Sequence, residues 1–247
     1  ESYYYKPGIT WSGVTSGKNS FRAYSNGFIF DSGANGFFPA DESMLTTLTA
    51  YLNSCISQYV LNIINPTINT GAGTVKKIPI IRSNSEDERN LLADLSSQCV
   101  VLSQTDWDSF ETSWDFQHHP LLRKVPTIAE AFDQWQAECE DRFKQLKANE
   151  EELNRIFIDI YGLQDELSPE VEDKDVTVRK ADLSRDIRSF ISYAVGCMFG
   201  RYSLDIDGLA YTGGEWNAGK YASFAADKDN IIPICDDAYF ADDIVGR

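Results

Sequence analysis

The feature that most constrains the fold is a pair of seven-residue repeats between residues 127 and 161. One row contains Phe132, Cys139, Leu146, Leu153 and Ile160, and the second contains Ile128, Trp135, Arg142, Asn149 and Ile156. Because this spacing keeps both rows on one face of a helix, it predicts a long helix rather than strands. Thr127 and Glu130 have capping-box spacing, and Gly162 is a typical helix stop. The sequence therefore predicts one helix of roughly 50 Å at a rise of 1.5 Å per residue.

Two polar residues, Arg142 and Asn149, interrupt this apolar face. Polar residues at such positions weaken a coiled coil but fix its register. Two interpretations therefore stay open. The helix either packs along its own domain, or it pairs with a partner or serves as a spacer.

The first hundred residues combine turn signals with short apolar runs. Residues 1–40 alternate aromatic and β-branched residues with Gly, Ser and Asn, and residues 28–30 suggest a strand bounded by Asn26-Gly27 and Ser32-Gly33. Three-to-four spacing predicts a helix over 41–64, capped by Asp41 and ended by Asn65-Pro66. Further strands are expected at 75–81 and 99–102, with an irregular aromatic segment over 103–126.

A second helix is expected at 183–199, after the acidic linker "LSPEVEDKDV". Gly200 is expected to end this helix, and a turn-rich tail covers 201–247. Its predicted buried face consists of Ile187, Phe190, Ile191, Ala194, Val195, Met198 and Phe199. We therefore predict an α+β fold class, with a β-rich domain over 1–125 and a mainly helical domain with a long helix over 126–247.

The distribution of charge restricts where a polyanion could bind. The net charge of the 247 residues is −16, which argues against nucleic acid when the chain is taken as a whole. Residues 1–85, however, hold six Lys/Arg against four Asp/Glu, so their balance is +2 and that of the remainder is −18. Any polyanionic partner is therefore expected at the N-terminal third.

Composition also indicates a compartment. No run of about 18 apolar residues occurs, so no membrane contact is expected, and the start lacks a signal peptide. The five cysteines (Cys55, Cys99, Cys139, Cys197 and Cys235) form no CxxC pair, which favours a reduced cytoplasmic protein. Both ends look cut, so we expect an internal segment of a longer protein.

Motifs for catalysis are expected to be absent from the chain. Asn65-Pro66-Thr67 lacks the second proline and the aromatic ring with which an adenine methyltransferase binds its flipped base. "GVTSGKN" is one residue short of a phosphate-binding loop. Glu170, Glu172 and Lys174 lie within five residues, which favours a solvated charge run over a nuclease site.

Metal sites are not expected either. His118 and His119 are adjacent, so their side chains should diverge, and no ligand lies at a suitable spacing. The pairs Asp205/Asp207 and Asp242/Asp243 lack the spacing of a calcium loop. We therefore expect that this chain is not catalytic on its own, with no catalytic residue, metal or bound cofactor.

Two polar segments are suited to binding DNA. The loop "SGKNSFR" offers Lys18, Asn19, Ser20 and Arg22, whose side chains suit base edges, because Arg or Lys bridges two acceptors on guanine and Asn pairs with adenine. "KKIPIIR" adds Lys76, Lys77 and Arg82, which are suited to phosphate. These seven residues are the candidate DNA-binding site.

Long motifs carry a family resemblance. "YYYKPGITWS", "SFRAYSNGFIFDSGANGFFP" and "YLNSCISQYVLNIINPTINTGAGTVKKIPII" resemble the region after the catalytic domain in PglX-type adenine-specific DNA methyltransferases of BREX phage-defence systems. "DWDSFETSWDFQHHPLL", "ISYAVGCMFGRYSLDIDGLAY" and "IIPICDDAYFADDIVGR" resemble the same family. The resemblance implies S-adenosylmethionine as cofactor of the parent protein but none in this chain. It also implies double-stranded DNA, an upstream methyltransferase domain and other defence proteins as partners.

The middle block is also similar to target recognition domains of type I specificity subunits and TaqI-like restriction-modification enzymes. There "LNS" lies on a helix and "IPI" closes a strand after a Gly-rich turn; the matching residues here are Leu52-Asn53-Ser54 and Ile78-Pro79-Ile80. Long spacer helices follow such domains, which is where residues 127–161 fall.

Three hypotheses for function follow. The first is a DNA sequence-recognition fragment of an N6-adenine methyltransferase, without its catalytic domain. The second is a protein-interaction module of a defence complex, with the long helix and the acidic tail docking partners. The third is the recognition domain of a fused restriction endonuclease. Steep salt dependence is expected only where phosphates are bound.

Overall fold

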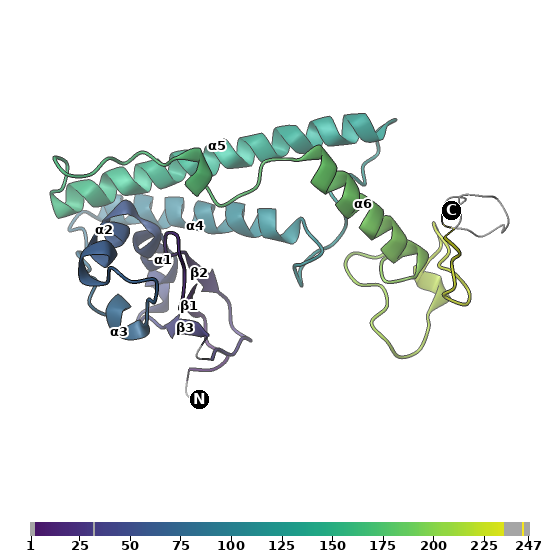
Figure 1. The fold of residues 1–247 in the computed structure, drawn as a ribbon, viewed down its shortest axis with the longest axis horizontal. Coiled ribbons are helices and arrows are strands. Elements are labelled where there is room, and N and C mark those ends of the chain that lie inside the picture. The colour runs from purple at the N-terminus through teal and green to yellow at the C-terminus, as the bar shows by residue number, and fades with distance from the viewer. Residues whose placement is uncertain (1–2, 32, 235–243, 245–247) are drawn as a thin grey trace. The chain divides into compact units, whose positions relative to one another are not determined.

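The computed structural model describes residues 3–31, 33–234 and 244. It divides into two compact units that interleave along the chain. Unit 1 comprises residues 1–103 and 142–178, and unit 2 comprises residues 104–141 and 179–247. Figure 1 gives the order of the elements along the chain. The domain boundary expected after residue 125 stays a prediction.

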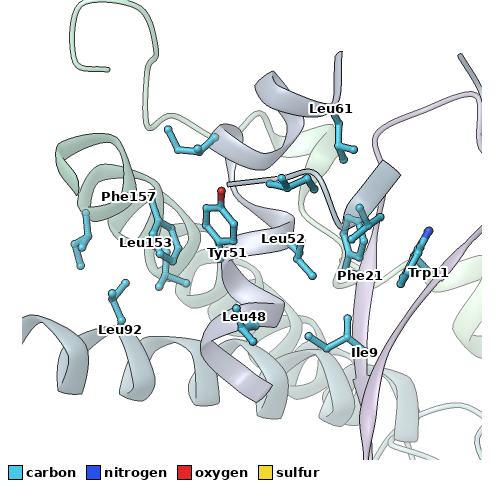
Figure 2. Packing of buried hydrophobic residues seen from close by; sticks show 14 of the residues in the cluster. Ile9, Trp11, Phe21, Leu48, Tyr51, Leu52, Leu61, Leu92, Leu153 and Phe157 are labelled. Atoms are coloured by element: carbon cyan, nitrogen blue, oxygen red, sulfur yellow. The ribbon is translucent and has the colours of Figure 1, made fainter. Parts of the chain in front are cut away.

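Unit 1 contains a three-stranded antiparallel sheet in the order β2-β1-β3. Strand β1 (Gly8–Ser12) lies between β2 (Phe21–Tyr24) and β3 (Ala34–Phe37), with Trp11 opposite both Phe21 and Asn35. Side chains alternate between the two faces of a sheet, and Ile9, Trp11 and Phe21 lie on the buried face. Figure 2 shows these side chains against the helices of unit 1. The α+β class is therefore confirmed.

The region predicted as a single helix over 41–64 is broken in two. A 3-10 turn (Glu42–Met44) leads into α1 (Leu45–Asn53), and α2 (Cys55–Ile64) follows. Ser54 separates the helices because its backbone is extended, with φ −68° and ψ 161°. Its hydroxyl accepts from the Ser57 N–H and thereby caps α2, which is how Ser side chains begin a helix. The cap at Asp41 is confirmed, since its carboxylate accepts from the Ser43 N–H at 3.0 Å.

Three predicted strands are wrong. Residues 28–30 form no strand; the Phe28 carbonyl instead accepts from the Tyr5 N–H at 2.8 Å, next to a turn at Gly27 with φ +100°. Residues 75–81 follow a short helix, α3 (Ala72–Val75), as turns and irregular chain. Residues 99–102 lie inside α4 (Glu86–Asp108). That helix begins with three acidic residues, which interact favourably with its N-terminal dipole.

The long helix is confirmed as α5 (Ile128–Tyr161), of 34 residues. The Thr127 hydroxyl accepts from the Glu130 N–H at 3.2 Å, and Gly162 ends the helix with φ +66°. In unit 1, Leu146, Leu153 and Ile156 are buried in the chain's own core. In unit 2, Trp135 and Cys139 are buried likewise. This packing favours the first interpretation, in which the helix packs along its own chain.

The polar interruption at Asn149 has a partner within unit 1. Asn149 is buried, and its side-chain amide donates to Gln98 of α4 at 3.2 Å while accepting from Gln145 at 2.8 Å. A buried amide whose donors and acceptors are used avoids most of its desolvation penalty. Asn149 therefore fixes how α4 and α5 align in unit 1.

In unit 2, helix α6 (Leu183–Met198) is confirmed, but its predicted buried face is partly wrong. Ile191 is 56% exposed and Phe199 is also exposed, whereas Asp186, Tyr193 and Cys197 are buried. The reason is Asp186, whose carboxylate accepts from the Trp135 indole at 3.0 Å and from Arg185 at 2.7 Å. These bonds turn a charged residue inward, which apolar periodicity alone does not anticipate.

Residues 201–234 are turn-rich, as expected for this part of the tail, and they include a 3-10 turn (Ala218–Lys220). Gly200 ends α6 with φ +73°. Across the described part of the chain, no helix is both long and apolar enough to cross a membrane.

Candidate nucleic-acid interface

The loop that carries Lys18, Asn19 and Ser20 is held by two side-chain amides. Gln58 of α2 accepts from the Asn19 N–H at 3.3 Å and donates to the Asn19 carbonyl at 3.0 Å. Asn53 of α1 accepts from the Phe21 N–H at 2.9 Å and donates to the Phe21 carbonyl at 2.8 Å. The two amides occupy the free edge of β2 in place of a neighbouring strand. The loop therefore enters the sheet with a fixed backbone.

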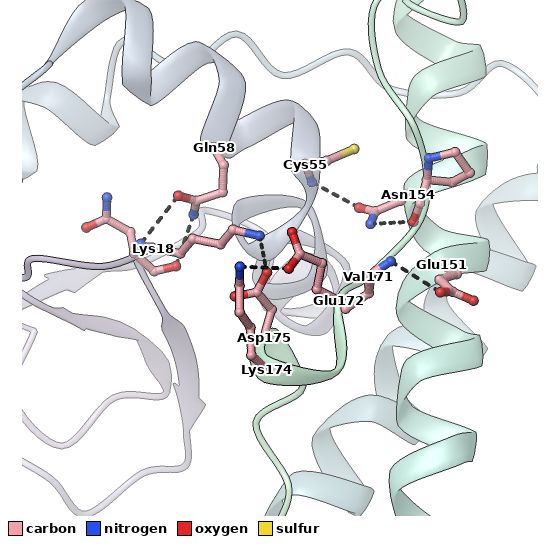
Figure 3. A network of polar contacts seen from close by, with 11 residues as sticks. Lys18, Cys55, Gln58, Glu151, Asn154, Val171, Glu172, Lys174 and Asp175 are labelled. Carbon is pink, nitrogen blue, oxygen red and sulfur yellow. Dashed lines mark hydrogen bonds and ion pairs between the residues drawn. The ribbon is translucent and has the colours of Figure 1, made fainter.

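Lys18 does not stand free on this loop. Its ammonium forms an ion pair with Asp175 at 2.6 Å, and the Asp175 side chain is only 20% exposed (Figure 3). An exposed pair of this kind contributes about 0–1 kcal/mol, so a phosphate could compete for the ammonium. Lys18 is thus engaged by the acidic segment of its own unit.

That acidic segment is ordered against unit 1 rather than solvated throughout. Asn154 of α5 donates to the Pro169 carbonyl at 3.1 Å and accepts from the Cys55 N–H at 2.9 Å. Glu151 accepts from the Val171 N–H at 3.2 Å (Figure 3). A 3-10 turn (Asp173–Asp175) follows. The linker expected from the sequence therefore packs on α2 and α5.

The carboxylates of the acidic segment lie beside lysines. Glu172 pairs with Lys174 at 2.7 Å, and Asp173 pairs with Lys147 at 2.7 Å. Within the described ranges, no group of three metal-ligating side chains is close enough to hold an ion. These carboxylates serve as partners of nearby lysines.

Glu150 adds an unusual ionisable group beside Lys18 and Asp175. Burial raises the pKa of Glu150 to about 7, with a further upward contribution from Asp175 and a smaller downward one from Lys18. Near neutral pH this carboxyl therefore exchanges a proton close to the loop.

Arg22 lies on β2 and faces the side of the sheet opposite to Phe21. Thr10 is its cross-strand neighbour on β1. The Arg22 side chain is exposed, and within the described residues it has neither an ion pair nor a hydrogen bond. The guanidinium is therefore available to an acceptor from outside the chain.

Lys76 and Lys77 follow α3 and are both exposed. Val75 and Ile78 on either side are buried in the core of unit 1, which directs the two lysines toward solvent. Arg82 is exposed too, and its charge adds slightly to the lowering of the Asp41 pKa that hydrogen bonds from Ser43 mainly cause. Within the described chain, no contact joins these three residues to the loop at 16–22, so they form a second group.

The backbone beside the second group is anchored by two tyrosine hydroxyls. Tyr51 of α1 and Tyr161 of α5 both donate to the Pro79 carbonyl, at 2.5 and 2.6 Å. The Tyr161 hydroxyl also accepts from the Ile81 N–H at 2.8 Å. These bonds replace the strand pairing expected for "IPI". Sequence reasoning did not identify Asn53, Gln58 or Tyr161 as functional, although Asn53 belongs to the "LNS" motif.

The histidines diverge, as expected. His119 is buried, and desolvation lowers its pKa to about 4. Its Nδ1 accepts from the Leu121 N–H at 3.2 Å, whereas His118 approaches Asp207 at 3.9 Å. The Asp205 carboxylate accepts a hydrogen bond from the Ser223 N–H. Asp242, Asp243 and Cys235 lie outside the described residues.

Comparison with known proteins identifies relatives along nearly the whole chain. No family model matches it. It is 49% identical to "Adenine-specific methyltransferase PglX" of Lacticaseibacillus casei (strain Zhang) over 97% of this chain and 20% of the relative. It is 32% identical to "Adenine-specific methyltransferase BrxX" of Escherichia coli O9:H4 (strain HS), over 99% of this chain and 22% of the relative. The chain thus spans about a fifth of the length of these proteins. The resemblance is confirmed, and the chain corresponds to a segment of a PglX-type adenine-specific methyltransferase.

Proposed function

We propose that this segment reads DNA sequence for an N6-adenine DNA methyltransferase of a restriction-modification or BREX phage-defence system. The observation that carries the proposal is a set of exposed basic side chains on a fixed framework in unit 1. Arg22, Lys76 and Lys77 have no carboxylate partner among the described residues, and Asn53, Gln58 and Tyr161 hold the backbone beside them. Base readout needs side chains held in register, and phosphate contacts need free positive charge.

The parent protein is proposed to supply the chemistry. Its upstream domain would bind S-adenosylmethionine and transfer the methyl group in the cytoplasm, while this segment selects the double-stranded DNA site. Asn65-Pro66-Thr67 supports this division, because it lacks the aromatic ring that an adenine-binding turn needs. The thiols of Cys99 and Cys197 have raised pKa values, caused mainly by burial, which disfavours a thiolate nucleophile.

A second candidate is an interaction module that binds other defence proteins. It is favoured by the balance of −18 over residues 86–247, which would repel DNA and attract a basic partner. A third candidate is the recognition domain of a fused restriction endonuclease, in which the nuclease would lie elsewhere in the parent protein.

The test is selection from a pool of random duplexes at low salt, using the 247-residue chain. We expect enrichment of a short shared sequence, lost or altered in Arg22→Ala. Lys76→Ala/Lys77→Ala should weaken binding to all sequences alike, since phosphate contacts carry no sequence information. The matched control is Lys124→Ala/Lys228→Ala, two exposed lysines of unit 2. No binding to any duplex, together with capture of a purified defence protein, would favour the interaction module.

A further inference from the structure

One face of the sheet in unit 1 is covered by aromatic side chains and not by the core. Ile9, Trp11 and Phe21 face the core, so alternation places Arg22, Tyr24 and Gly36 on the opposite face. Six rings gather on this side, and they are named here the outer aromatic surface. Its members are Tyr3, Tyr4, Tyr24, Phe28, Phe30 and Phe38.

The rings form one connected chain of contacts. Phe28 meets Tyr24 at 6.1 Å between ring centroids, and Tyr24 meets Phe38 at 6.5 Å. Phe38 then meets Tyr3 at 4.9 Å and Phe30 at 5.3 Å. Distances of this size are typical of aromatic pairs. The surface is therefore continuous and not a set of isolated rings.

Two glycines let the rings lie close to the sheet. A Cβ atom on Gly8 would lie 2.8 Å from the Tyr24 hydroxyl, and one on Gly36 would lie 2.9 Å from the Phe38 ring. Any larger residue would displace these rings. Because Gly8 and Gly36 have no side chain, the Tyr24 and Phe38 rings can pack directly on the backbone of the sheet.

Two of the six rings are open to solvent, and the other four are half-buried. Phe28 is 53% exposed and Tyr3 is 52% exposed, and the neighbouring Ile29 is exposed as well. Contiguous apolar surface of this kind marks a binding site more often than single exposed residues do. The exposed rings are those of Phe28 and Tyr3. An exposed aromatic ring favours a ligand with planar groups, because such groups can stack on it.

Positive charge accompanies the rings. Arg22 lies on the same face as Tyr24, and the Lys6 ammonium lies 5.5 Å from the centroid of the Tyr3 ring. The carboxylate of Asp31, which follows Phe30, accepts from the Gly33 N–H at 2.8 Å. Exposed rings beside cations are the combination that binds unpaired nucleotides, because bases stack on the rings and phosphates meet the cations.

We propose that the outer aromatic surface binds an unpaired stretch of DNA, with bases stacked on Phe28 and Tyr3 and a phosphate at Arg22. This inference rests on the proposed DNA-reading function and deepens it, since it adds a single-strand contact on the opposite face from the core. The polyanion is favoured over an apolar protein partner because two cations, Arg22 and Lys6, accompany the rings, against one described carboxylate, Asp31.

The experiment compares one labelled oligothymidylate of about ten nucleotides with a duplex of the same length, a size within the usual site range. Fluorescence anisotropy is measured with the 247-residue chain, Phe28→Ala, Arg22→Ala and the control Trp114→Ala, an exposed aromatic of unit 2. Phe28→Ala should weaken single-strand binding at least about fivefold and leave duplex binding unchanged, because one stacked base contributes about 1–3 kcal/mol. Trp114→Ala should bind both like the parent chain.

Three results would overturn the inference. They are no single-strand binding by the parent chain, Phe28→Ala binding within twofold of the parent, or a dimer in sedimentation that Phe28→Ala dissolves. If duplex binding persists and depends on Lys76 and Lys77, only this inference fails. If no duplex binds either, the proposed DNA-reading function fails with it.

Discussion

The side-chain amide of Asn53 brackets the backbone of Phe21, with its oxygen 2.9 Å from the Phe21 nitrogen and its nitrogen 2.8 Å from the Phe21 carbonyl oxygen. The same nitrogen also donates to the Thr49 carbonyl at 2.9 Å. One side chain thereby joins helix α1 to the edge of β2. The free edge of the sheet is closed without a fourth strand, and the loop with Lys18 and Asn19 emerges from that closed edge.

Replacement of Asn53 tests this closure. Asn53→Ala removes three hydrogen bonds, and each contributes about 0.5–1.5 kcal/mol net. We expect the free energy of unfolding to fall by about 1.5–4.5 kcal/mol in urea denaturation. Asn62→Ala, an exposed position on α2, is the matched control and should change stability little. Equal stability of the two variants would show that the bracket does not hold the edge.

Tyr161 should hold the segment beside Lys76 and Lys77. In Tyr161→Phe, the Ile81 N–H loses its acceptor and the Pro79 carbonyl keeps only Tyr51. Hydrogen exchange at the Ile81 amide should accelerate by roughly a factor of 10, corresponding to about 1.4 kcal/mol of lost protection. Tyr5→Phe, at an exposed position in the same unit, should leave that amide unchanged. Unaltered exchange in Tyr161→Phe would contradict the anchoring role.

Glu150 should make stability depend on pH. Its folded-state pKa is raised to about 7 from the ordinary value of 4.5, so the folded chain holds the proton more tightly than the unfolded chain. Its contribution is therefore present at low pH and is lost as pH rises through the window from about 4.5 to 7, with a slope of at most about 1.4 kcal/mol per pH unit.

The measurement is urea denaturation across this pH window for the parent chain and Glu150→Gln. The variant cannot ionise at this position, so its stability should fall less between pH 5 and 7. Glu215→Gln, an exposed acid of unit 2, should follow the parent. Parallel curves for the parent and Glu150→Gln would contradict the raised pKa.

Release of Lys18 should strengthen binding to phosphate. Asp175→Asn removes the ion pair at 2.6 Å and one negative charge beside the loop. We expect duplex affinity at low salt to rise by roughly two- to fivefold, the scale of an exposed pair worth about 0.2–1 kcal/mol. Asp165→Asn, at an exposed acid of unit 1, controls for net charge. A gain of the same size in both variants would show that Lys18 is not specifically restrained.

Elements with strong local signals could be predicted from the sequence. The heptad rows, the Thr127 cap and the stop at Gly162 together define α5, and the apolar spacing and Gly200 define α6. The predicted strands at 75–81 and 99–102 were wrong because tertiary contacts override short apolar runs. The first is held by Tyr161, 82 positions from Pro79. The second lies inside α4, where Cys99 and Leu102 are partly buried against residues of α5.

The candidate site could likewise be predicted only in part from the sequence, because contacts between distant positions determine the rest. Arg22, Lys76 and Lys77 were found from residue type, and their exposure agrees with that choice. The ion pair of Lys18 joins positions 157 apart, and the Gln58 bonds to Asn19 join positions 39 apart. No local pattern encodes such partners. The outer aromatic surface likewise emerges only when the turn at Gly27 and the extended strands bring their rings together.

The salt dependence of duplex binding tests the central claim most directly. For the 247-residue chain, the logarithm of the binding constant should fall linearly with the logarithm of salt concentration, with a slope of about −0.9 per phosphate contacted. Lys76→Ala/Lys77→Ala should make this slope shallower by about 1 to 2, while Lys124→Ala/Lys228→Ala leaves it unchanged. A flat dependence, or a slope that the two control lysines alter as much as Lys76 and Lys77, would contradict a DNA-reading face on unit 1.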